Sequence, residues 1–525
     1  MEVSNAASTP YDDVLYPSGL FPQTHPDRFA SVAYLRGMSL DSIECCRVLE
    51  LGCGTADNLI TMAFQFPGSE FVGIDLGRVP IASGQALVTE LGMRNVTLLA
   101  MDLCEPSLNQ FGEFSFIIVH GVYSWVPQSV RERILQICQN TLTAQGIAYI
   151  SYNAYPGCHF RDLVRHMMLF HTQKFEGIAE KATQARALVK FLADSRIKPD
   201  YYSESLLAQL GRVTKHSDES LYHDDLNAFA RPFYFHEFME EAARYDLQYI
   251  GEAVPDDSDR TLFTPEALRR IGELEGANEI VREQYKDFLR GTGFRQTLLC
   301  RKEIQLAPAF LDERIPALFA MCDCEPATDP PATGDPPVEG KSPDGGTVET
   351  VNPLWRTALS YICSQWPCAA SFEQILENVR QTDAKRTADS IRATETAIIA
   401  AALKASYLVG EVSLRIHPPK LVNRFSERPA ISQLAHEQLR QNRPLSSQLH
   451  RSMKITDFAL KHFMSLLDGT RDVETLSAEM IAFKESHVSK SQEGDSIEPG
   501  ILEANLKQGI ENTLAALMRA GMLVS

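Results

Sequence analysis

The chain has 525 residues, of which 44% are hydrophobic and 22% are charged, and its formal net charge is −18. This composition is typical of packed globular domains and excludes a mostly disordered or collagen-like chain, and the length suggests roughly three or four domains. The acidic excess lies in residues 1–352, which carry 30 basic and 49 acidic side chains, against 20 and 19 in residues 353–525. Because an acidic surface repels a phosphate backbone, nucleic-acid binding is disfavoured.

The cysteines and the apolar segments indicate a reducing compartment. Eleven cysteines, an odd number, are scattered along the chain, which is typical of reduced thiols in a cytoplasm. The close pairs Cys45-Cys46 and Cys322-x-Cys324 lack the spacing of a zinc site, so we expect no metal. The N-terminus lacks the pattern of a secretion signal, and the apolar stretch 397–409 is too short to span a bilayer. We therefore expect a cytoplasmic protein without membrane insertion.

Residues 1–44 form an N-terminal segment with regularly placed aromatic side chains, among them Tyr11, Tyr16 and Phe21. The segment either folds over a ligand as a lid or forms a helix that docks on the rest of the chain. The sequence leaves both alternatives open, and under the first one Tyr16 contacts the ligand.

An α/β domain with a doubly wound sheet is predicted over residues 45–302. Apolar runs alternate with helical patterns, and each parallel crossover needs such a covering helix. Residues 160–230 show helical and loop patterns and are predicted as an insertion, and residues 255–292 as a second, helical insertion. The seven predicted strands are residues 47–51, 70–75, 95–100, 114–120, 147–152, 247–254 and 294–300. The expected fold is therefore a seven-stranded Rossmann-like sheet.

The remainder of the chain is predicted as a linker and a winged-helix-like region. Six prolines and four glycines at 325–350 place the linker at 323–352. Beyond it, 355–416 and 457–525 each show three helical patterns followed by an apolar, β-like tail. This pattern predicts an α+β, winged-helix-like domain over 353–525, with a degenerate duplication.

A glycine-containing turn follows the first strand directly and opens the first helix. Gly52 and Gly54 allow a ligand to approach the backbone closely. Asp75 ends the second strand, where a carboxylate suits ribose hydroxyls, and Asp102 follows the third strand, where it suits an adenine amino group. Because Ala56 replaces the third glycine of a dinucleotide site, an adenosine ligand without phosphates fits better. The alternative is a Rossmann-like domain with an idle glycine turn. The predicted contacts along these strand ends are Glu50, Gly52, Cys53, Gly54, Asn58, Asp75, Leu76, Asp102 and Leu103.

The loop after the fourth strand (HGVYSWVP) is predicted to face the reacting group, because ligands of doubly wound sheets bind outside the carboxyl ends of the strands. We expect His120 and Gly121 to contact the cofactor, and Tyr123 and Trp125 to form an aromatic wall around a cation or an amine. The alternatives are that Trp125 fills the core and that His120 is a hydrogen-bonded strand-end residue. Asn153, after the fifth strand, is able to orient an amine lone pair, unless it merely caps a turn.

Several segments together resemble one bacterial family. They are YDDVLYPSGLFPQTHPDRFA, VLELGCGTADN, HGVYSWVP, SYNAYPG, RPFYFHEF and FRQTLLC. The resemblance covers roughly residues 10–302 and extends loosely to LLDGTRDVETL at 466–476. The family is that of the class I S-adenosylmethionine-dependent methyltransferases with a methyltransferase regulatory domain, whose rickettsial branch methylates lysines of an outer-membrane protein. Its regulatory region corresponds to residues 215–302, which our strand prediction places inside the catalytic sheet.

The resemblance implies S-adenosylmethionine as the cofactor and a methyltransferase activity. It favours a protein lysine N-methyltransferase that acts on a protein or peptide, with a surface or outer-membrane protein among the candidates and a homodimer left open. A small-molecule methyltransferase is one alternative, and a non-catalytic regulator whose tail binds DNA is another. The helices near 371–379 and 472–481 are not basic, which disfavours DNA binding. The residues that the resemblance assigns to the cofactor and the substrate wall are Glu50, Gly52, Gly54, Asp75, Asp102, Tyr123 and Trp125.

Overall fold

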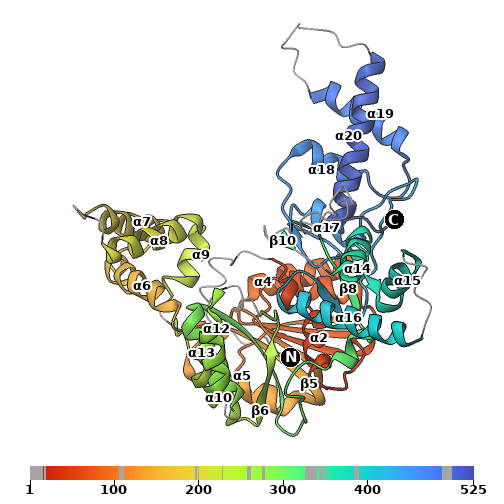
Figure 1. Ribbon diagram of the computed structural model, residues 1–525. Helices are drawn as coiled ribbons and strands as arrows, with labels where there is room; N and C mark the ends of the chain where they lie inside the picture. Colours follow the sequence, from red (N-terminus) through yellow and green to blue (C-terminus); the bar gives the residue numbers. More distant parts are fainter. Residues whose placement is uncertain are drawn as a thin grey trace. The chain divides into compact units, whose positions relative to one another are not determined.

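The protein, described by a computed structural model, forms two compact units (Figure 1). The sheet unit comprises residues 1–18, 37–88 and 94–306, and the C-terminal unit comprises residues 19–36, 89–93 and 307–525. The residues that the structure describes are 16, 19–105, 111–195, 198, 200–227, 229–256, 262–274, 278–324, 340–341, 347–348, 352–382, 389–487 and 499–525.

One seven-stranded sheet, in the order β3-β2-β1-β4-β5-β7-β6, organises the sheet unit. The strands are β1 (Arg47–Leu51), β2 (Glu70–Asp75), β3 (Val96–Ala100), β4 (Phe114–Val119), β5 (Leu142–Asn153), β6 (Leu247–Glu252) and β7 (Phe294–Arg301). The first five run parallel, whereas β7 is antiparallel to both of its neighbours. The central strands are apolar runs buried on both faces, as a parallel sheet covered by helices requires. The predicted seven-stranded Rossmann-like sheet is confirmed.

The fifth strand begins earlier than predicted. Helix α5 (Gln128–Thr141) runs directly into β5 at Leu142, which is fully buried and pairs with Phe114. The pairing register shifts between Phe114 and Phe116, so residues 143–146 form an irregular part of the strand. Gly146, which precedes the predicted strand, therefore lies inside the observed one.

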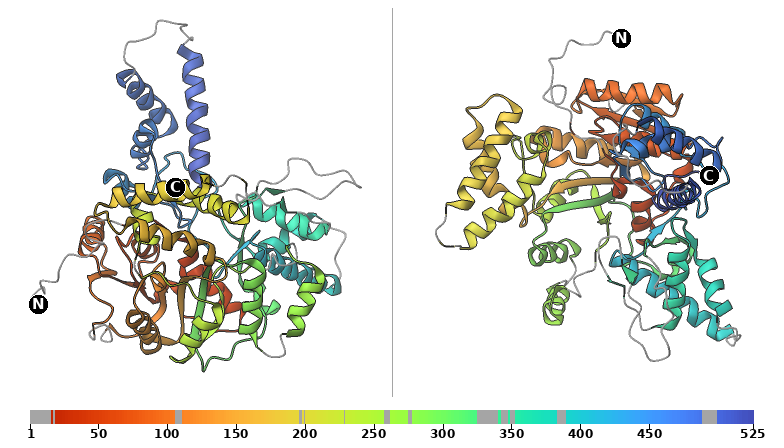
Figure 2. Two further views of the ribbon diagram at one scale, coloured as in Figure 1. Left: turned by 90° about the vertical axis from the view of Figure 1, so that its left-hand side faces the viewer. Right: turned by 90° about the horizontal axis from the view of Figure 1, so that it is seen from above.

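Helices cover both faces of the sheet and build two insertions. The helices of the sheet unit are α3 (Asp57–Gln65), α4 (Arg78–Glu90), α5, α6 (Cys158–Thr172), α7 (Ile178–Asp194), α8 (Tyr201–Lys215), α9 (Asp218–Asp224), α10 (Phe235–Ala243), α12 (Pro265–Leu274) and α13 (Glu279–Arg290). Helices α6 to α9 occupy the predicted first insertion and stand together as a lobe beside the sheet in Figures 1 and 2. This lobe has an apolar core of its own, which includes Val164, Val189 and Leu206.

The C-terminal unit contains two halves, each a group of helices with short strands, and the second half begins at Gln433, earlier than the predicted residue 457. The first half has a three-stranded antiparallel sheet in the order β11-β8-β12. Its elements are β8 (Phe319–Met321), α14 (Pro353–Ser364), β11 (Ala370–Ser371), α15 (Phe372–Thr382), α16 (Asp389–Leu408) and β12 (Ser413–Arg415). The second half contains α17 (Gln433–Arg440), β13 (Leu445–Ser446), β14 (Ser452–Met453), α18 (Phe458–Ser465), α19 (Val473–His487) and α20 (Pro499–Arg519).

The N-terminal helix α2 (Pro26–Leu35) belongs to the C-terminal unit. The carboxylate of Asp27 accepts hydrogen bonds from the N–H groups of Ile416 at 3.1 Å and His417 at 2.8 Å. These contacts favour the docking alternative over a lid for this part of the N-terminal segment.

Some predictions concern residues outside the described part of the chain. The residues concerned are Tyr11 and most of the linker. Of the linker, the structure describes two short paired strands, β9 (Gly340–Lys341) and β10 (Thr347–Val348). In the part that is described, no helix combines the length and the apolar character needed to cross a membrane.

Candidate active site

The predicted ligand contacts converge at one edge of the sheet. Following the order β3-β2-β1-β4-β5, the carboxyl ends of the strands carry Asp102, Asp75, the Glu50–Gly54 turn, His120 and Asn153. The strand order reverses between β1 and β4, and such a switch point opens the crevice in which ligands of doubly wound folds bind.

The two glycines of the turn have different physical roles. Gly52 has a φ of +76°, and a Cβ at this position would lie 2.3 Å from Cγ2 of Val122 in the loop after β4. Gly54 has a φ of +55° and faces open space. The N–H groups of Gly52 and Cys53 donate to the carbonyl of Ile74, at 2.7 and 3.1 Å. The turn is thus fixed against β2 and the β4 loop, and its Gly54 side is open to a ligand.

Glu50 lies beneath this turn and carries an unsatisfied carboxylate oxygen. Its side chain is buried, and Oε1 accepts a hydrogen bond from Nδ2 of Asn58 at 2.9 Å. Its Oε2 is buried without a hydrogen-bond partner among the described residues. Burial, and secondarily the negative charge of Asp75, raise the pKa of Glu50 to about 8. Since buried polar atoms are normally paired, this oxygen marks a place for a donor or a cation from a ligand.

The two predicted acidic residues are held by backbone N–H groups. Oδ2 of Asp75 accepts from Gly54 and Oδ1 accepts from Gly77, both at 2.8 Å. Asp102 is exposed, and its Oδ1 accepts from the N–H of Cys104 at 2.9 Å. A carboxylate oxygen can accept more than one hydrogen bond, so these backbone contacts are compatible with hydrogen bonds from a nucleoside.

The predicted apolar contacts differ in exposure. Leu76 is 46% exposed, whereas Leu103 is partly buried against the sheet core. Burial raises the pKa of the Cys53 thiol, with added contributions from the carboxylates of Asp75 and Glu50. Because this thiol stays neutral, we expect Cys53 to contact a ligand through its backbone.

The loop after β4 is attached to β5. Nδ1 of His120 lies 3.0 Å from the hydroxyl of Tyr149 and 3.3 Å from Oγ of Ser151. The N–H of Gly121 donates to the same Ser151 Oγ at 2.9 Å. Burial lowers the pKa of His120 to about 4, so its imidazole is neutral at pH 7 and does not repel a cation. His120 is thus the hydrogen-bonded strand-end residue of our alternative, and a contact with the cofactor stays a prediction.

Tyr123 lies in the core of the sheet unit, and its predicted place in the substrate wall stays a prediction. Its side chain is fully buried, with the ring 5.4 Å from that of Phe233 and 5.3 Å from that of Phe238. Its hydroxyl donates to Oε2 of Glu241 at 2.7 Å. The short 3-10 turn at Tyr123–Trp125 directs this side chain toward α10, which the local sequence does not reveal.

Trp125 and Asn153 remain candidates for contacts with the predicted amine. Trp125 is partly exposed, and the guanidinium of Arg161 lies 5.1 Å from the centre of its ring. Arg161 is held by Asp225 at 2.8 Å, so the ring already binds a cation from its own chain. The backbone N–H of Asn153 donates to Oγ of Ser124 at 2.8 Å, which fixes the end of β5 to the β4 loop.

Tyr16 contacts the inserted lobe. Its hydroxyl donates to Oδ2 of Asp224 at 3.5 Å, and its ring lies edge-on to His223 at 5.8 Å. Burial and the carboxylate of Asp224 raise the pKa of Tyr16 to about 12. Its predicted contact with the cofactor stays a prediction.

An aromatic cluster beyond β5 was missed by the sequence analysis. Tyr155 stacks on His159 with ring centroids 4.1 Å apart and lies 5.3 Å from Tyr234. The hydroxyl of Tyr155 donates to Asp162 at 2.6 Å. The one sequence signal for this cluster was Tyr155, the aromatic residue that follows the fifth strand in SYNAYPG. The same motif contains Ser151 near the end of the strand, a position that could have predicted its contacts with His120 and Gly121.

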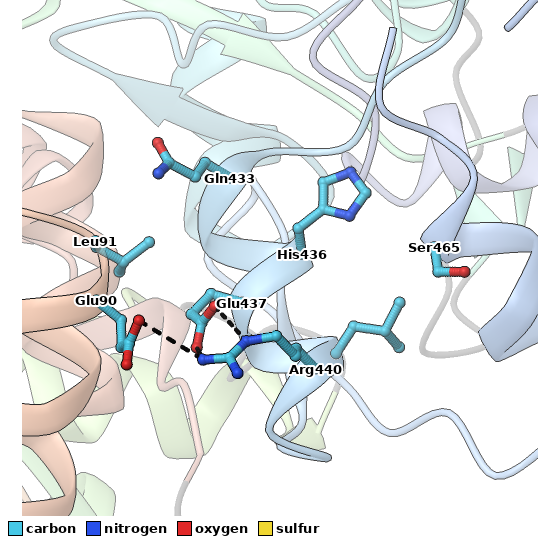
Figure 3. Close-up of a pocket in the computed structure, with 8 residues that line it drawn as sticks. Glu90, Leu91, Gln433, His436, Glu437, Arg440 and Ser465 are labelled. Carbon is cyan, nitrogen blue, oxygen red and sulfur yellow. Dashed lines mark hydrogen bonds and ion pairs between the residues drawn. The ribbon is translucent and has the colours of Figure 1, made fainter. Parts of the chain in front are cut away.

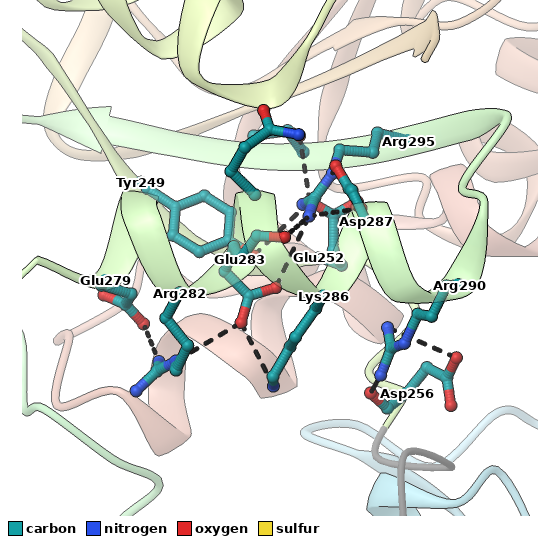
Figure 4. Close-up of polar contacts among 12 residues, drawn as sticks. Tyr249, Glu252, Asp256, Glu279, Arg282, Glu283, Lys286, Asp287, Arg290 and Arg295 are labelled. Atoms are coloured by element: carbon teal, nitrogen blue, oxygen red, sulfur yellow. Dashed lines mark hydrogen bonds and ion pairs between the residues drawn. The ribbon is translucent and has the colours of Figure 1, made fainter. Parts of the chain in front are cut away.

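A buried ionic network fixes the antiparallel edge of the sheet (Figure 4). Arg295 on β7 forms ion pairs with Asp287 at 2.8 Å, with Glu252 at 2.7 Å and with Glu283 at 3.6 Å. Its guanidinium also lies 3.9 Å from the ring centre of Phe235. Since every member is paired, the network holds β6, β7 and α13 together and offers no vacant ligand position.

A pocket of about 420 Å³ belongs to the C-terminal unit and is lined by residues of α17, by Ser465 and by Glu90 and Leu91 (Figure 3). Its charged lining is self-paired, because Arg440 contacts Glu437 at 2.7 Å and Glu90 at 3.7 Å. Glu90 ends α4, a helix that begins at the carboxyl edge of the sheet and runs to the opposite edge. None of the residues that line the pocket is among the predicted ligand contacts.

Comparison with known families agrees with this geometry. One family model, described as a methyltransferase domain, matches residues 48–146, and a predicted methyltransferase regulatory domain matches residues 217–301. A third, the C-terminal winged-helix domain of PKMT, matches residues 427–522. The uncharacterised protein RP028 of Rickettsia prowazekii is 32% identical over 241 residues, which cover 46% of this chain and 96% of RP028.

The chain belongs to this bacterial family of class I methyltransferases with a methyltransferase regulatory domain. A further relative, RP789 of Rickettsia prowazekii, is 38% identical over 304 residues, which are 57% of this chain and about half (54%) of RP789. The solved structure of PKMT2 from Rickettsia typhi shares the fold, with a TM-score of 0.85 and 23% identity over 97% of this chain and 100% of that one. The structure of PKMT2 in complex with AdoHcy gives a TM-score of 0.84 at 24% identity.

The cofactor of a methyltransferase domain of this family is S-adenosylmethionine, as predicted, and the residues present fit it. Gly54 leaves room beside the turn, and the carboxylates of Asp75 and Asp102 stand at the two neighbouring strand ends. The unpaired Oε2 of Glu50 suits a ligand that carries positive charge. The segment matched as regulatory, 217–301, includes β6 and β7 and thus completes the sheet itself.

Proposed function

We propose that the chain is an S-adenosylmethionine-dependent protein lysine N-methyltransferase. The observation that carries the proposal is the likeness of the whole chain to Rickettsia typhi PKMT2, together with the PKMT winged-helix match at residues 427–522. We propose further that it works in the cytoplasm on lysines of another protein, with a surface or outer-membrane protein as the first substrate to test. A homodimer belongs to the same proposal.

The proposed cofactor-binding residues hold and orient the cofactor. When bound, S-adenosylmethionine supplies an electrophilic methyl group on a sulfonium. Gly54 admits the ligand beside the turn, while Asp75 and Asp102 are the proposed acceptors for the ribose hydroxyls and the adenine amino group. The Oε2 of Glu50 attracts the positive charge of the ligand. His120, neutral because it is buried, adds no repulsion.

The acceptor side must present a neutral amine. Loss of a proton from a free lysine costs about 4–5 kcal/mol at pH 7, and a nearby positive charge and a dry pocket both lower the pKa of the amine. We assign Trp125 and Asn153 to orientation of this amine, with Tyr155 as a further aromatic contact. Since alignment of nucleophile and methyl carbon is the main requirement, no dedicated general base is needed.

The test is incubation of the full chain with radiolabelled S-adenosylmethionine and cell lysate, followed by separation of protein from small molecules. Label on protein lysines, identified by mass spectrometry, is the expected result. Label confined to small molecules would establish the alternative of a small-molecule methyltransferase. A salt-sensitive gel shift with DNA and no label transfer would establish the regulator alternative. The control is the chain with Asp75→Ala, which we expect to transfer no label.

A further inference from the structure

Three cysteine side chains meet in the first half of the C-terminal unit. Cys322 and Cys324 directly follow β8, and Cys363 lies in the last turn of α14. All three are buried, with at most 5% exposure, and their Sγ atoms lie within 4.8 Å of one another. Cys363 is remote from the other two in sequence, so the fold alone creates the cluster.

The spacing of the sulfurs suits a tetrahedral metal ion. A zinc–sulfur bond is about 2.3 Å long, which places the sulfurs of a tetrahedral site about 3.8 Å apart. The three sulfurs lie close enough for one ion to contact all of them, since each is within 4.8 Å of the other two. The Sγ of Cys322 donates to the carbonyl of Glu411 at 3.3 Å. The cluster thus provides sulfur ligands with soft, metal-binding chemistry.

A candidate for the fourth ligand lies on a third element. Glu411 lies in the turn that precedes β12 and is tied to Cys322 through its backbone carbonyl, and its side chain would have to rotate to bring the carboxylate to the three sulfurs. Arg451 and Arg519 both contact the carboxylate of Asp323, at 3.4 and 3.6 Å, so this group of three side chains carries one net positive charge beside Cys322 and Cys324. Three thiolates and one carboxylate would leave a zinc site with excess negative charge, which this net positive charge partly offsets.

We propose that Cys322, Cys324 and Cys363, with Glu411 as the fourth ligand, bind one Zn²⁺ ion that holds the first winged-helix-like half together. The ion would join β8, α14 and the turn before β12. It would also close the stretch of chain between Cys324 and Cys363, which contains the predicted linker. Closure of a long loop removes entropy from the unfolded chain, so the ion would stabilise this half. The position is separate from the methyltransferase site, and the proposal does not rest on the proposed function.

The test is metal analysis of the full chain, purified under reducing conditions without a chelator. We expect about one Zn²⁺ per chain, and less than about one tenth of this with Cys324→Ser or Cys363→Ser. The matched controls are Cys45→Ser and Cys104→Ser, which change exposed thiols elsewhere and should leave the zinc content unchanged.

A second measurement uses the wild-type chain, so its result does not depend on whether the variants fold. After removal of the metal, titration with Co²⁺ should produce thiolate-to-cobalt charge-transfer absorption that saturates at one equivalent and disappears when Zn²⁺ is added. A chelator should lower Tm, and Zn²⁺ should restore it. Glu411→Gln should weaken the affinity for Zn²⁺, and an unchanged affinity would overturn the assignment of the fourth ligand.

A wild-type chain without zinc and without a cobalt band would overturn the proposal. So would a disulfide between any two of the three cysteines, found by mass spectrometry without reduction. A metal site was not expected from the sequence, because the spacing of Cys322 and Cys324 does not reveal that Cys363 joins them.

Discussion

Glu50 is a buried acid, and its burial opposes ionisation of the carboxyl group. Because the folded chain raises its pKa from 4.5 to about 8, the folded form holds the proton more tightly than the unfolded form. The free energy of unfolding that this group contributes is therefore highest below pH 4.5 and falls as the pH rises toward 8. A bound cation reverses this preference by favouring the ionised carboxylate.

The first prediction follows for Glu50→Gln, which keeps an acceptor for Asn58 but removes the charge. We expect at least about a tenfold loss of affinity for S-adenosylmethionine, since a charged contact is worth more than about 1.4 kcal/mol. At pH 8 the ligand-free variant should be no less stable than the wild type. Calorimetry across pH 6 to 9 should show that wild-type affinity rises relative to the variant as Glu50 ionises. Parallel pH profiles for the two proteins would contradict this role.

The second prediction concerns Trp125, which contacts Arg161 rather than the glycine turn. Trp125→Ala should keep the affinity for S-adenosylmethionine within about twofold. It should lose most of the turnover, because the substitution removes a side chain that orients the amine of the substrate. Trp125→Phe, which retains an aromatic face, is the matched control and should keep much of the activity. Full kcat in Trp125→Ala would move the acceptor site elsewhere.

At the scale of elements, the approach of the β1 turn to the β4 loop depends on one missing Cβ. The third prediction is that Gly52→Ala is more harmful than Gly54→Ala, because both have positive φ but Gly52 alone faces Val122 at 2.3 Å. Gly54→Ala should cost about 1 kcal/mol of backbone strain, and Gly52→Ala about 1–3 kcal/mol more from overpacking. Chemical unfolding measures both. Val122→Ala should partly rescue Gly52→Ala, and equal stability of the two single variants would contradict the contact.

The inserted lobe depends on a buried acid. Asp225 is fully buried between Arg161 at 2.8 Å and Arg212 at 2.9 Å. The fourth prediction is that Asp225→Asn lowers the free energy of unfolding by about 3 kcal/mol, because two arginines then share a neutral partner. The control Lys190→Met removes an exposed pair with Asp194 and should change stability by less than about 1 kcal/mol. Equal effects in the two variants would show that Asp225 is not a structural centre of the lobe.

At the scale of the whole molecule, the acidic charge of residues 1–352 provides a long-range attraction for a lysine-rich protein. These residues carry 49 acidic and 30 basic side chains. The fifth prediction is that kcat/KM for a lysine-rich protein substrate falls several-fold between about 0.05 and 0.3 M salt, since screening shortens the reach of the field. An uncharged peptide with one lysine is the control and should show a weak dependence. The same slope for both substrates would exclude charge steering.

The sequence by itself determined that the sheet has seven strands, where they lie along the chain, the glycine turn and the acids at the strand ends. These features are local, because alternating apolar runs and helical patterns specify a parallel sheet, and a parallel sheet gathers its carboxyl ends at one edge. This is why Glu50, Asp75 and Asp102 could be placed correctly on that edge without coordinates.

Tertiary structure decided which side chains face the crevice and which meet across the fold. Tyr123 turns into the core because α10 supplies Glu241 and Phe238, and Trp125 is covered by Arg161 from the inserted lobe. Likewise, Cys363 reaches Cys322 and Cys324 through the packing of α14. Such contacts join residues far apart in the chain, and neither local periodicity nor spacing encodes them.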